Sequence, residues 1–188
     1  MIILKKYFNN KVLVIKSNVY SDSRGFFSEF YNKDDFKKIG IHKEFKQDNF
    51  SLSKKKFTLR GIHLQEKPYS QAKLIRVVYG KIIDIIVDLR KKSDTFGMYK
   101  KITLSDKNSE MIYIPEGFGH GFLTLSKNTM VNYKVSNFYS PLSEITIHYK
   151  DSELNLNLGK YENIKFTVSK KDLKGISIYD YKKRKYKK

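Results

Sequence analysis

Residues 71–90, QAKLIRVVYGKIIDIIVDLR, restrict the possible folds more than any other segment, because their apolar positions run almost without interruption. Runs of this kind are typical of strands that are buried on both faces or line a barrel. Elsewhere the apolar runs are shorter, rich in Val, Ile, Tyr and Phe, and separated by Gly, Pro and polar clusters. This spacing favours an all-β barrel or sandwich.

Two further segments predict local structure. Residues 1–20 contain two apolar runs separated by FNNK, which indicates an opening hairpin. At residues 32–40, Asn32 suits a helix N-cap, aspartates follow it in the first turn, and Gly40 stands near the end. We therefore expect helix to be a minor component of the fold.

The length of 188 residues, with no repeat and no Gly/Ser linker, predicts one domain over residues 1–180. The residues at 181–188 are mostly Lys and Arg, and we expect them to form a solvated, disordered tail. No cysteine is present, which excludes disulfides, thiolate metal sites and thiol nucleophiles. The N-terminal residues lack an apolar run long enough for a signal sequence or a membrane span. A cytoplasmic protein with no membrane partner is expected.

The net charge of +19 favours a partner that carries phosphate. Nucleic acid, acidic lipid and a small nucleotide-bearing substrate all meet that description. Only five of the 38 basic residues are Arg, and the Lys residues are spread over every segment, which indicates a compositional bias rather than a binding patch. A nucleic-acid-binding module is an alternative supported only by the charge and the tail, so we expect no nucleic-acid partner.

The histidines bear on the metal question. A barrel of short strands with His63 in an HxQ segment and His120 in PEGFGHG suggests the cupin architecture. Metal-binding cupins usually present HxH, whereas this chain has Gln65 at the second position. Two imidazoles without a suitable carboxylate are poor ligands for a catalytic metal, so we expect a site with no metal and no cofactor.

The segment LRGIHLQ at 59–65 poses a geometric problem. Residues two apart in a strand share a face, so strict alternation would separate Arg60 from His63. If both serve one site, the strand needs a twist or a bulge, and Gly61 is the expected position.

A set of motifs resembles the nucleotide-sugar 3,5-epimerases typified by dTDP-4-dehydrorhamnose 3,5-epimerase. They occur in that family's order and cover most of the chain. The motifs are DSRGFFSEF, QDNFSLS, LRGIHLQ, QAKLIRVVYGKIIDIIVDLR, SDTFG, YIPEGFGHGFL, YK, YSPLSE and VSKKD. The resemblance implies a cupin-type jelly-roll barrel and epimerisation of a nucleotide diphosphate-4-keto-6-deoxy sugar for surface carbohydrate biosynthesis.

The chemistry needs a base on one face of the sugar, an acid on the other, and a group that stabilises the enolate formed between them. By resemblance His63 is the base and Asp172 orients it. Tyr133 is the acid, and Lys73 stabilises the charge on the C4 oxygen.

The resemblance also assigns the groups that bind substrate. Arg24 and Arg60 would hold the diphosphate, for which a guanidinium is well suited. Phe27 and Tyr139 would pack near the nucleotide. The remaining contacts fall on Glu29, Gln47, Asn49, His120, Glu144 and Lys171. In the family the segment that holds Arg24 and Glu29 reaches into a neighbouring subunit, which implies a homodimer.

The chain departs from the family pattern in lacking Trp entirely, which affects the residues around the sugar's C5 substituent and the nucleotide. Thymidine or guanosine, hexose or heptose, and inversion of one or both centres therefore stay open. A 3,4-ketoisomerase of the same substrates and a non-catalytic cupin that binds nucleotide sugars are the remaining alternatives.

Overall fold

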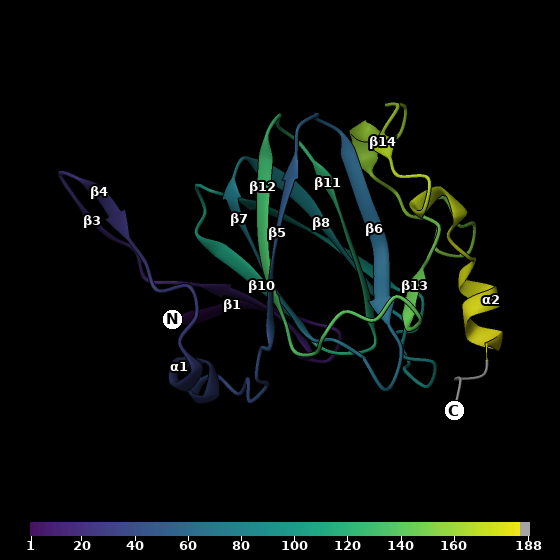
Figure 1. The fold of residues 1–188 in the computed structure, drawn as a ribbon, viewed down its shortest axis with the longest axis horizontal. Coiled ribbons are helices and arrows are strands. Elements are labelled where there is room, and N and C mark those ends of the chain that lie inside the picture. Colours follow the sequence, from purple (N-terminus) through teal and green to yellow (C-terminus); the bar gives the residue numbers. More distant parts are fainter. Residues whose placement is uncertain (185–188) are drawn as a thin grey trace.

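The computed structural model describes residues 1–184 and contains two large sheets that face each other (Figure 1). The strands of the first sheet, in spatial order, are β1 (Ile2–Tyr7), β2 (Val12–Lys16), β10 (Glu110–Ile114), β7 (Lys73–Tyr79), β12 (Thr129–Val135) and β5 (Gln47–Ser53). Those of the second are β13 (Glu144–Thr146), β6 (Thr58–Gln65), β11 (Phe118–Thr124), β8 (Lys81–Asp88) and β9 (Tyr99–Ser105).

The pairings between these strands are antiparallel, and the short β14 (Thr167–Val168) adds to β6 in parallel. A separate hairpin, β3 (Tyr20–Asp22) and β4 (Gly25–Phe27), projects from the body of the barrel (Figure 1). This is the all-β arrangement that the sequence predicted. The opening hairpin is confirmed by the pairing of β1 with β2.

The continuous apolar run at 71–90 is buried on both faces, as predicted. In β8, Ile82 and Ile86 point between the two sheets into the barrel core. Ile85 and Val87 point the other way, toward a second core that C-terminal residues cover. One strand thus supplies apolar side chains to two layers, because every second residue of a strand points to the same face.

Helices close the outside of the barrel. The helix α1 (Lys33–Lys38) begins after Asn32, whose side chain accepts hydrogen bonds from two backbone N–H groups of the first turn. This confirms the predicted N-cap. Its buried Phe36 packs on the outer face of the first sheet. Among the described residues, no helix is long and apolar enough to cross a membrane.

The C-terminal helix α2 (Ile178–Lys183) corrects the predicted start of the tail at residue 181. Tyr181 is only 2% exposed and packs with Ile178 on the outer core of the second sheet. Residues three apart share a helix face, so a lysine-rich segment still buries one apolar edge while its ammonium groups stay in water. The predicted disorder at residues 185–188 lies outside the described residues. Two short 3-10 turns, η1 (Gly159–Tyr161) and η2 (Asp172–Lys174), complete this region.

The predicted irregularity at Gly61 is confirmed. On β11, His120 pairs with His63 and Phe122 pairs with Arg60, so two residues of β6 oppose Gly121 alone. That two-against-one count defines a β-bulge. Gly61 has φ +105°, and a Cβ there would lie 2.6 Å from the Cα of Gly121. A side chain would not fit, and the bulge turns Arg60 and His63 toward one cavity.

Candidate active site

A cavity of about 550 Å³ opens between the two sheets. This volume lies within the range of small-molecule sites. Nine of the predicted site residues line it, and they come from both sheets and from the C-terminal segment. They are Arg60, His63, Lys73, His120, Tyr133, Tyr139, Glu144, Lys171 and Asp172.

His63 and Asp172 form a pair in the wall of the cavity. The distance from His63 Nε2 to Asp172 Oδ1 is 2.7 Å. The other carboxylate oxygen accepts a hydrogen bond from the backbone N–H of Gly61 at 3.3 Å. Burial opposes ionisation of Asp172, but the hydrogen bond and charge of His63, together with hydrogen bonds from Gly61 and Ser169, outweigh it, and the pKa of this carboxyl is lowered. With Nε2 engaged by the carboxylate, Nδ1 is the nitrogen that is free to accept a proton.

Tyr133 enters the cavity from the opposite sheet. It lies on β12 and pairs with Asn49 of the edge strand β5. Burial raises the pKa of Tyr133, and the charge of Arg60 offsets this only in part. The phenol therefore stays protonated at neutral pH and can act as an acid. A group that can accept a proton, from one sheet, and a group that can donate one, from the other, border the same space.

Lys73 is 8% exposed and donates to the backbone carbonyl of His63 over 3.3 Å. Burial lowers the pKa of Lys73 to about 8, although the charges of Asp84 and Glu144 act in the opposite direction. At neutral pH the side chain is mostly an ammonium, held where water is scarce. A cation is most effective at stabilising a developing oxyanion in such a place.

A second histidine–aspartate pair lies deeper, and its aspartate was not among the predicted site residues. His120 Nε2 and Asp84 Oδ2 are 2.7 Å apart, and Asp84 is completely buried. Burial lowers the pKa of His120 despite the neighbouring carboxylate. The signal in the sequence was an isolated Asp inside the apolar run KIIDIIVD, where a charge needs a partner.

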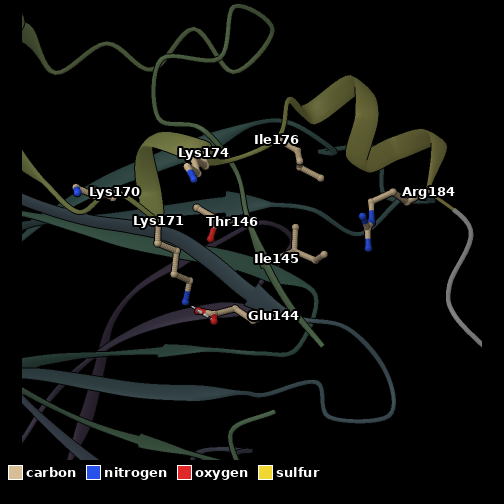
Figure 2. Close-up of a pocket in the computed structure, with 8 residues that line it drawn as sticks. All are labelled: Glu144, Ile145, Thr146, Lys170, Lys171, Lys174, Ile176 and Arg184. Atoms are coloured by element: carbon tan, nitrogen blue, oxygen red, sulfur yellow. Dashed lines mark hydrogen bonds and ion pairs between the residues drawn. The ribbon is translucent and has the colours of Figure 1, made fainter. Parts of the chain in front are cut away.

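Glu144 joins two groups at the rim. It accepts a hydrogen bond from the Tyr139 hydroxyl at 2.7 Å and forms an ion pair with Lys171. Figure 2 shows Lys171 reaching Glu144 beside an adjoining pocket whose wall also carries Lys170 and Lys174. Burial raises the pKa of Glu144, but the hydrogen bonds from Lys171 and Tyr139 favour the carboxylate, and the net effect is a lowered pKa.

Five predicted residues do not line the cavity. Gln47 and Asn49 lie on β5 and hydrogen-bond to each other at 2.8 Å. Gln47 also accepts from the backbone N–H of Tyr139, so it supports the rim instead.

The other three lie on or just after the β3–β4 hairpin, where all are exposed: Arg24, Phe27 and Glu29. Arg24 pairs with the neighbouring Asp22 at 2.6 Å. Glu29 lies beyond β4, which ends at Phe27. These three residues contribute nothing to the cavity wall of their own chain.

Several lining residues were not predicted from the sequence. None carries a side chain with a distinctive chemical signature. They are Ser51, Thr58, Leu59, Gly121, Phe122, Thr167, Val168 and Ser169.

Gln65 stands where metal-binding cupins have a histidine, and its amide is fully engaged. Its Nε2 donates to the carbonyls of Tyr69 at 2.6 Å and Phe138 at 3.1 Å. Its Oε1 accepts from the backbone N–H of Ser140 at 2.7 Å. Across residues 1–184 no group of three or more His, Cys, Asp or Glu side chains is arranged to hold a metal ion.

Comparisons with known proteins agree with this arrangement. A family model described as dTDP-4-dehydrorhamnose 3,5-epimerase matches residues 9–180. The dTDP-4-dehydrorhamnose 3,5-epimerase of Shigella flexneri is 41% identical over 170 residues, which are 90% of this chain and 92% of that protein.

Solved structures superpose closely. The dTDP-4-dehydrorhamnose 3,5-epimerase of Bacillus anthracis, with TDP and PPi bound, gives a TM-score of 0.88 at 36% identity, covering 93% of this chain and 98% of its own. The 3,5-epimerase RmlC of Legionella pneumophila, in complex with dTDP-4-keto-L-rhamnose, gives 0.85 at 36% identity, covering 93% of this chain and 91% of its own. These neighbours confirm the predicted cupin-type jelly roll. With the family match spanning residues 9–180, the chain belongs to the dTDP-4-dehydrorhamnose 3,5-epimerase family.

Proposed function

We propose that the chain inverts C3 and C5 of a dTDP-4-keto-6-deoxyhexose, as an isomerase of surface carbohydrate biosynthesis in the cytoplasm. One observation carries the proposal. His63, which is paired with Asp172, and Tyr133 come from different sheets and line a single cavity. Inversion at carbon needs a proton removed from one face and returned to the other, so acceptor and donor have to stand on opposite sides.

The steps balance without any added reagent. His63 takes the proton from C3 or C5, and the C–H electron pair forms a C=C bond to C4 while the carbonyl π pair moves onto its oxygen. Lys73 stabilises that enolate oxygen as an ammonium. Tyr133 returns a proton to the opposite face and the carbonyl forms again. The imidazolium of His63 then releases its proton to water, and the phenolate of Tyr133 takes a proton from water, so both groups are restored. Asp172 holds the imidazole and stabilises its charged form.

Binding of the nucleotide diphosphate is assigned to Arg60 at the cavity wall and to Tyr139, Glu144 and Lys171 at the rim. Arg60 has no carboxylate within ion-pair distance among residues 1–184, so its charge is available to a phosphate. His120 is also assigned to the sugar.

The proposal includes a homodimer in which the β3–β4 hairpin of each subunit completes the cavity of the other. The hairpin exposes three aromatic rings: Tyr20 at 60%, Phe26 at 64% and Phe27 at 65%. Exposed rings on a projecting arm favour a protein partner. Arg24, Phe27 and Glu29 would then reach substrate from the partner's hairpin.

The activity is tested by incubating the protein in deuterated water with dTDP-4-keto-6-deoxyglucose and reading the product by NMR. The proposal expects inversion and deuterium at both C3 and C5. Deuterium at one centre only would indicate a single-centre epimerase. A product with its carbonyl at C3 would indicate a ketoisomerase. Absence of deuterium would indicate a protein that binds the sugar without catalysis. Parallel reactions with GDP-linked 4-keto sugars test which nucleotide base the protein accepts. His63→Ala should abolish labelling, whereas His42→Ala, which alters an exposed histidine, should not.

The shared site is tested by mixing two inactive variants, His63→Ala and Arg24→Ala. If hairpins are exchanged, a mixed dimer contains one cavity with an intact base and an intact partner arm, so activity returns on mixing. Sedimentation measures the dimer directly. A monomer, or a mixture that stays inactive after subunits have exchanged, would refute this part of the proposal.

A further inference from the structure

A second pocket, of about 580 Å³, adjoins the rim of the cavity and shares Glu144 and Lys171 with it. We call it the lysine pocket, because four of its eight lining residues are cations: Lys170, Lys171, Lys174 and Arg184. Figure 2 shows Lys171, Lys174 and Thr146 at one end of it. The lining contains no aromatic ring that could stack on a nucleotide base. Its composition suits a small anion better than a nucleoside.

The 3-10 turn η2 directs two lysines to this pocket. Lys171 caps the turn and Lys174 ends it, and the backbone N–H of Lys174 donates to the carbonyl of Lys171 over 3.0 Å. Residues three apart on a 3-10 turn lie one above the other. Asp172, between them, is buried and pairs with His63 instead. The turn that supplies a carboxylate to the active site therefore also holds two ammonium groups at the lysine pocket.

Backbone hydrogen bonds fix the adjacent wall of the pocket. The N–H of Ile176 donates to the carbonyl of Thr146 at 2.9 Å, and the N–H of His148 donates to the carbonyl of Ile176 at 2.9 Å. Gly175 permits this approach, because a Cβ there would lie 2.6 Å from the nitrogen of His148. The hydroxyl of Thr146 has no hydrogen-bond partner among residues 1–184. A rigid wall thus presents an unused donor beside the lysines.

The cations of the lysine pocket are only partly neutralised. Lys171 forms an ion pair with Glu144, and Arg184 lies 3.9 Å from Glu66 in a loose one. Within residues 1–184, Lys174 has no carboxylate at ion-pair distance. Like charges that line one pocket repel each other, so a bound anion relieves that repulsion and also accepts hydrogen bonds from the ammonium groups.

We propose that the lysine pocket is a second oxyanion site, in which Lys171, Lys174 and the Thr146 hydroxyl bind a phosphate ion. Lys171 couples this site to the active site, because it also neutralises Glu144, which accepts from the Tyr139 hydroxyl. A phosphate that attracts Lys171 leaves Glu144 less neutralised and adds negative charge beside the nucleotide. Phosphate and nucleotide therefore weaken each other's binding, by the same factor in both directions. The coupling rests on the proposed function, whereas the anion site does not.

Calorimetry with inorganic phosphate tests the site. The protein is first saturated with TDP, so that the active site is occupied, and chloride at the same ionic strength is the reference. A single phosphate per chain is expected. Lys174→Gln should weaken its binding by about tenfold, the effect of one charge-assisted hydrogen bond. Thr146→Val keeps the size and the charge and should weaken it several-fold. The control Lys127→Gln, at an exposed lysine outside the pocket, should bind phosphate as the wild type does.

The coupling is measured as the change in TDP affinity when phosphate is added. Phosphate also competes directly within the active site, but that competition is the same in the wild type and in Lys174→Gln. The wild type should therefore lose several-fold more TDP affinity than this variant does. Equal losses in the two proteins would refute the coupling and leave the anion site standing.

Two outcomes would overturn the anion site. One is the absence of phosphate binding to the protein saturated with TDP. The other is equal weakening in Lys174→Gln and Lys127→Gln, which would mean a diffuse positive field without a defined site. Wild-type affinity in Thr146→Val would remove the hydroxyl from the site. If the wild type does not bind TDP, the proposed function fails, and titration of the free protein with phosphate still decides the anion site.

Discussion

His63 and Asp172 are separated by 109 residues in the chain, yet His63 Nε2 lies 2.7 Å from Asp172 Oδ1. The histidine is on β6, and the aspartate begins the 3-10 turn η2 near the C-terminus. Short parallel pairing of β14 with β6 brings the two segments together. The C-terminal segment thus supplies a group on which the proposed base depends.

Asp172→Asn should lower turnover by roughly two orders of magnitude or more, because the amide can favour the wrong tautomer and cannot stabilise the imidazolium. KM should change little. The folded pKa of Asp172 is lowered, so its stabilising contribution is present above the ordinary aspartate pKa and is lost as pH falls through the lowered value. Steady-state kinetics and acid unfolding of both proteins test this. Near-normal turnover would contradict the orienting role.

Tyr133→Phe should separate two events that the wild type couples. The variant lacks the acid, so inversion should fall by roughly two to four orders of magnitude. His63 can still remove and return a proton on its own face, so deuterium should still enter the unreacted substrate. His63→Ala should lose both exchange and inversion. Equal loss of exchange and inversion in Tyr133→Phe would assign that tyrosine a different role.

Lys73 gives opposite predictions for activity and stability as pH rises. Because its pKa is about 8, activity that needs the ammonium should decline from about pH 8 upward. The unfolded chain keeps this proton up to the ordinary value of 10.5, so this group's contribution to the free energy of unfolding should rise over that interval. The change should vanish in Lys73→Met, which we expect to lose about two to three orders of magnitude in turnover. If the difference in unfolding free energy between the wild type and Lys73→Met does not change with pH over this interval, the lowered pKa of Lys73 is refuted.

Gly61→Ala should destabilise the fold by about 3 kcal/mol, because the new methyl group meets the backbone of β11 at a positive φ. Gly97→Ala is the matched control. Gly97 has φ +79° but no atom within 4 Å of an added Cβ, so only backbone strain of about 1 kcal/mol is expected. Urea unfolding of the two variants measures the difference. Equal losses would mean that the close approach of β6 and β11 is not what requires glycine.

Local patterns predicted much of the fold. The two-sided burial of β8, the cap at Asn32 and the bulge at Gly61 each follow from a few neighbouring residues. The last helix could not be predicted from its neighbouring residues, because the burial of Tyr181 depends on a sheet whose strands lie far earlier in the chain.

The cavity could be predicted only in part. Asp84 was missed because its partner His120 is brought close by strand pairing, which a linear sequence does not display. Ser51 was missed because a serine in an alternating strand has no distinctive pattern. Arg24, Phe27 and Glu29 were predicted from family resemblance, and they do not line the cavity because they lie on or just after the projecting β3–β4 hairpin.

The amide of Gln65 ties the loop after β6 to the loop that follows β12. A histidine ligand at this position would free two carbonyls and one N–H, and both loops would need new partners. Conversion of this barrel to a metal site would therefore require coordinated substitutions in both loops as well as the new ligand. A single exchange of Gln65 for histidine would lose the anchor before it gained a complete set of ligands.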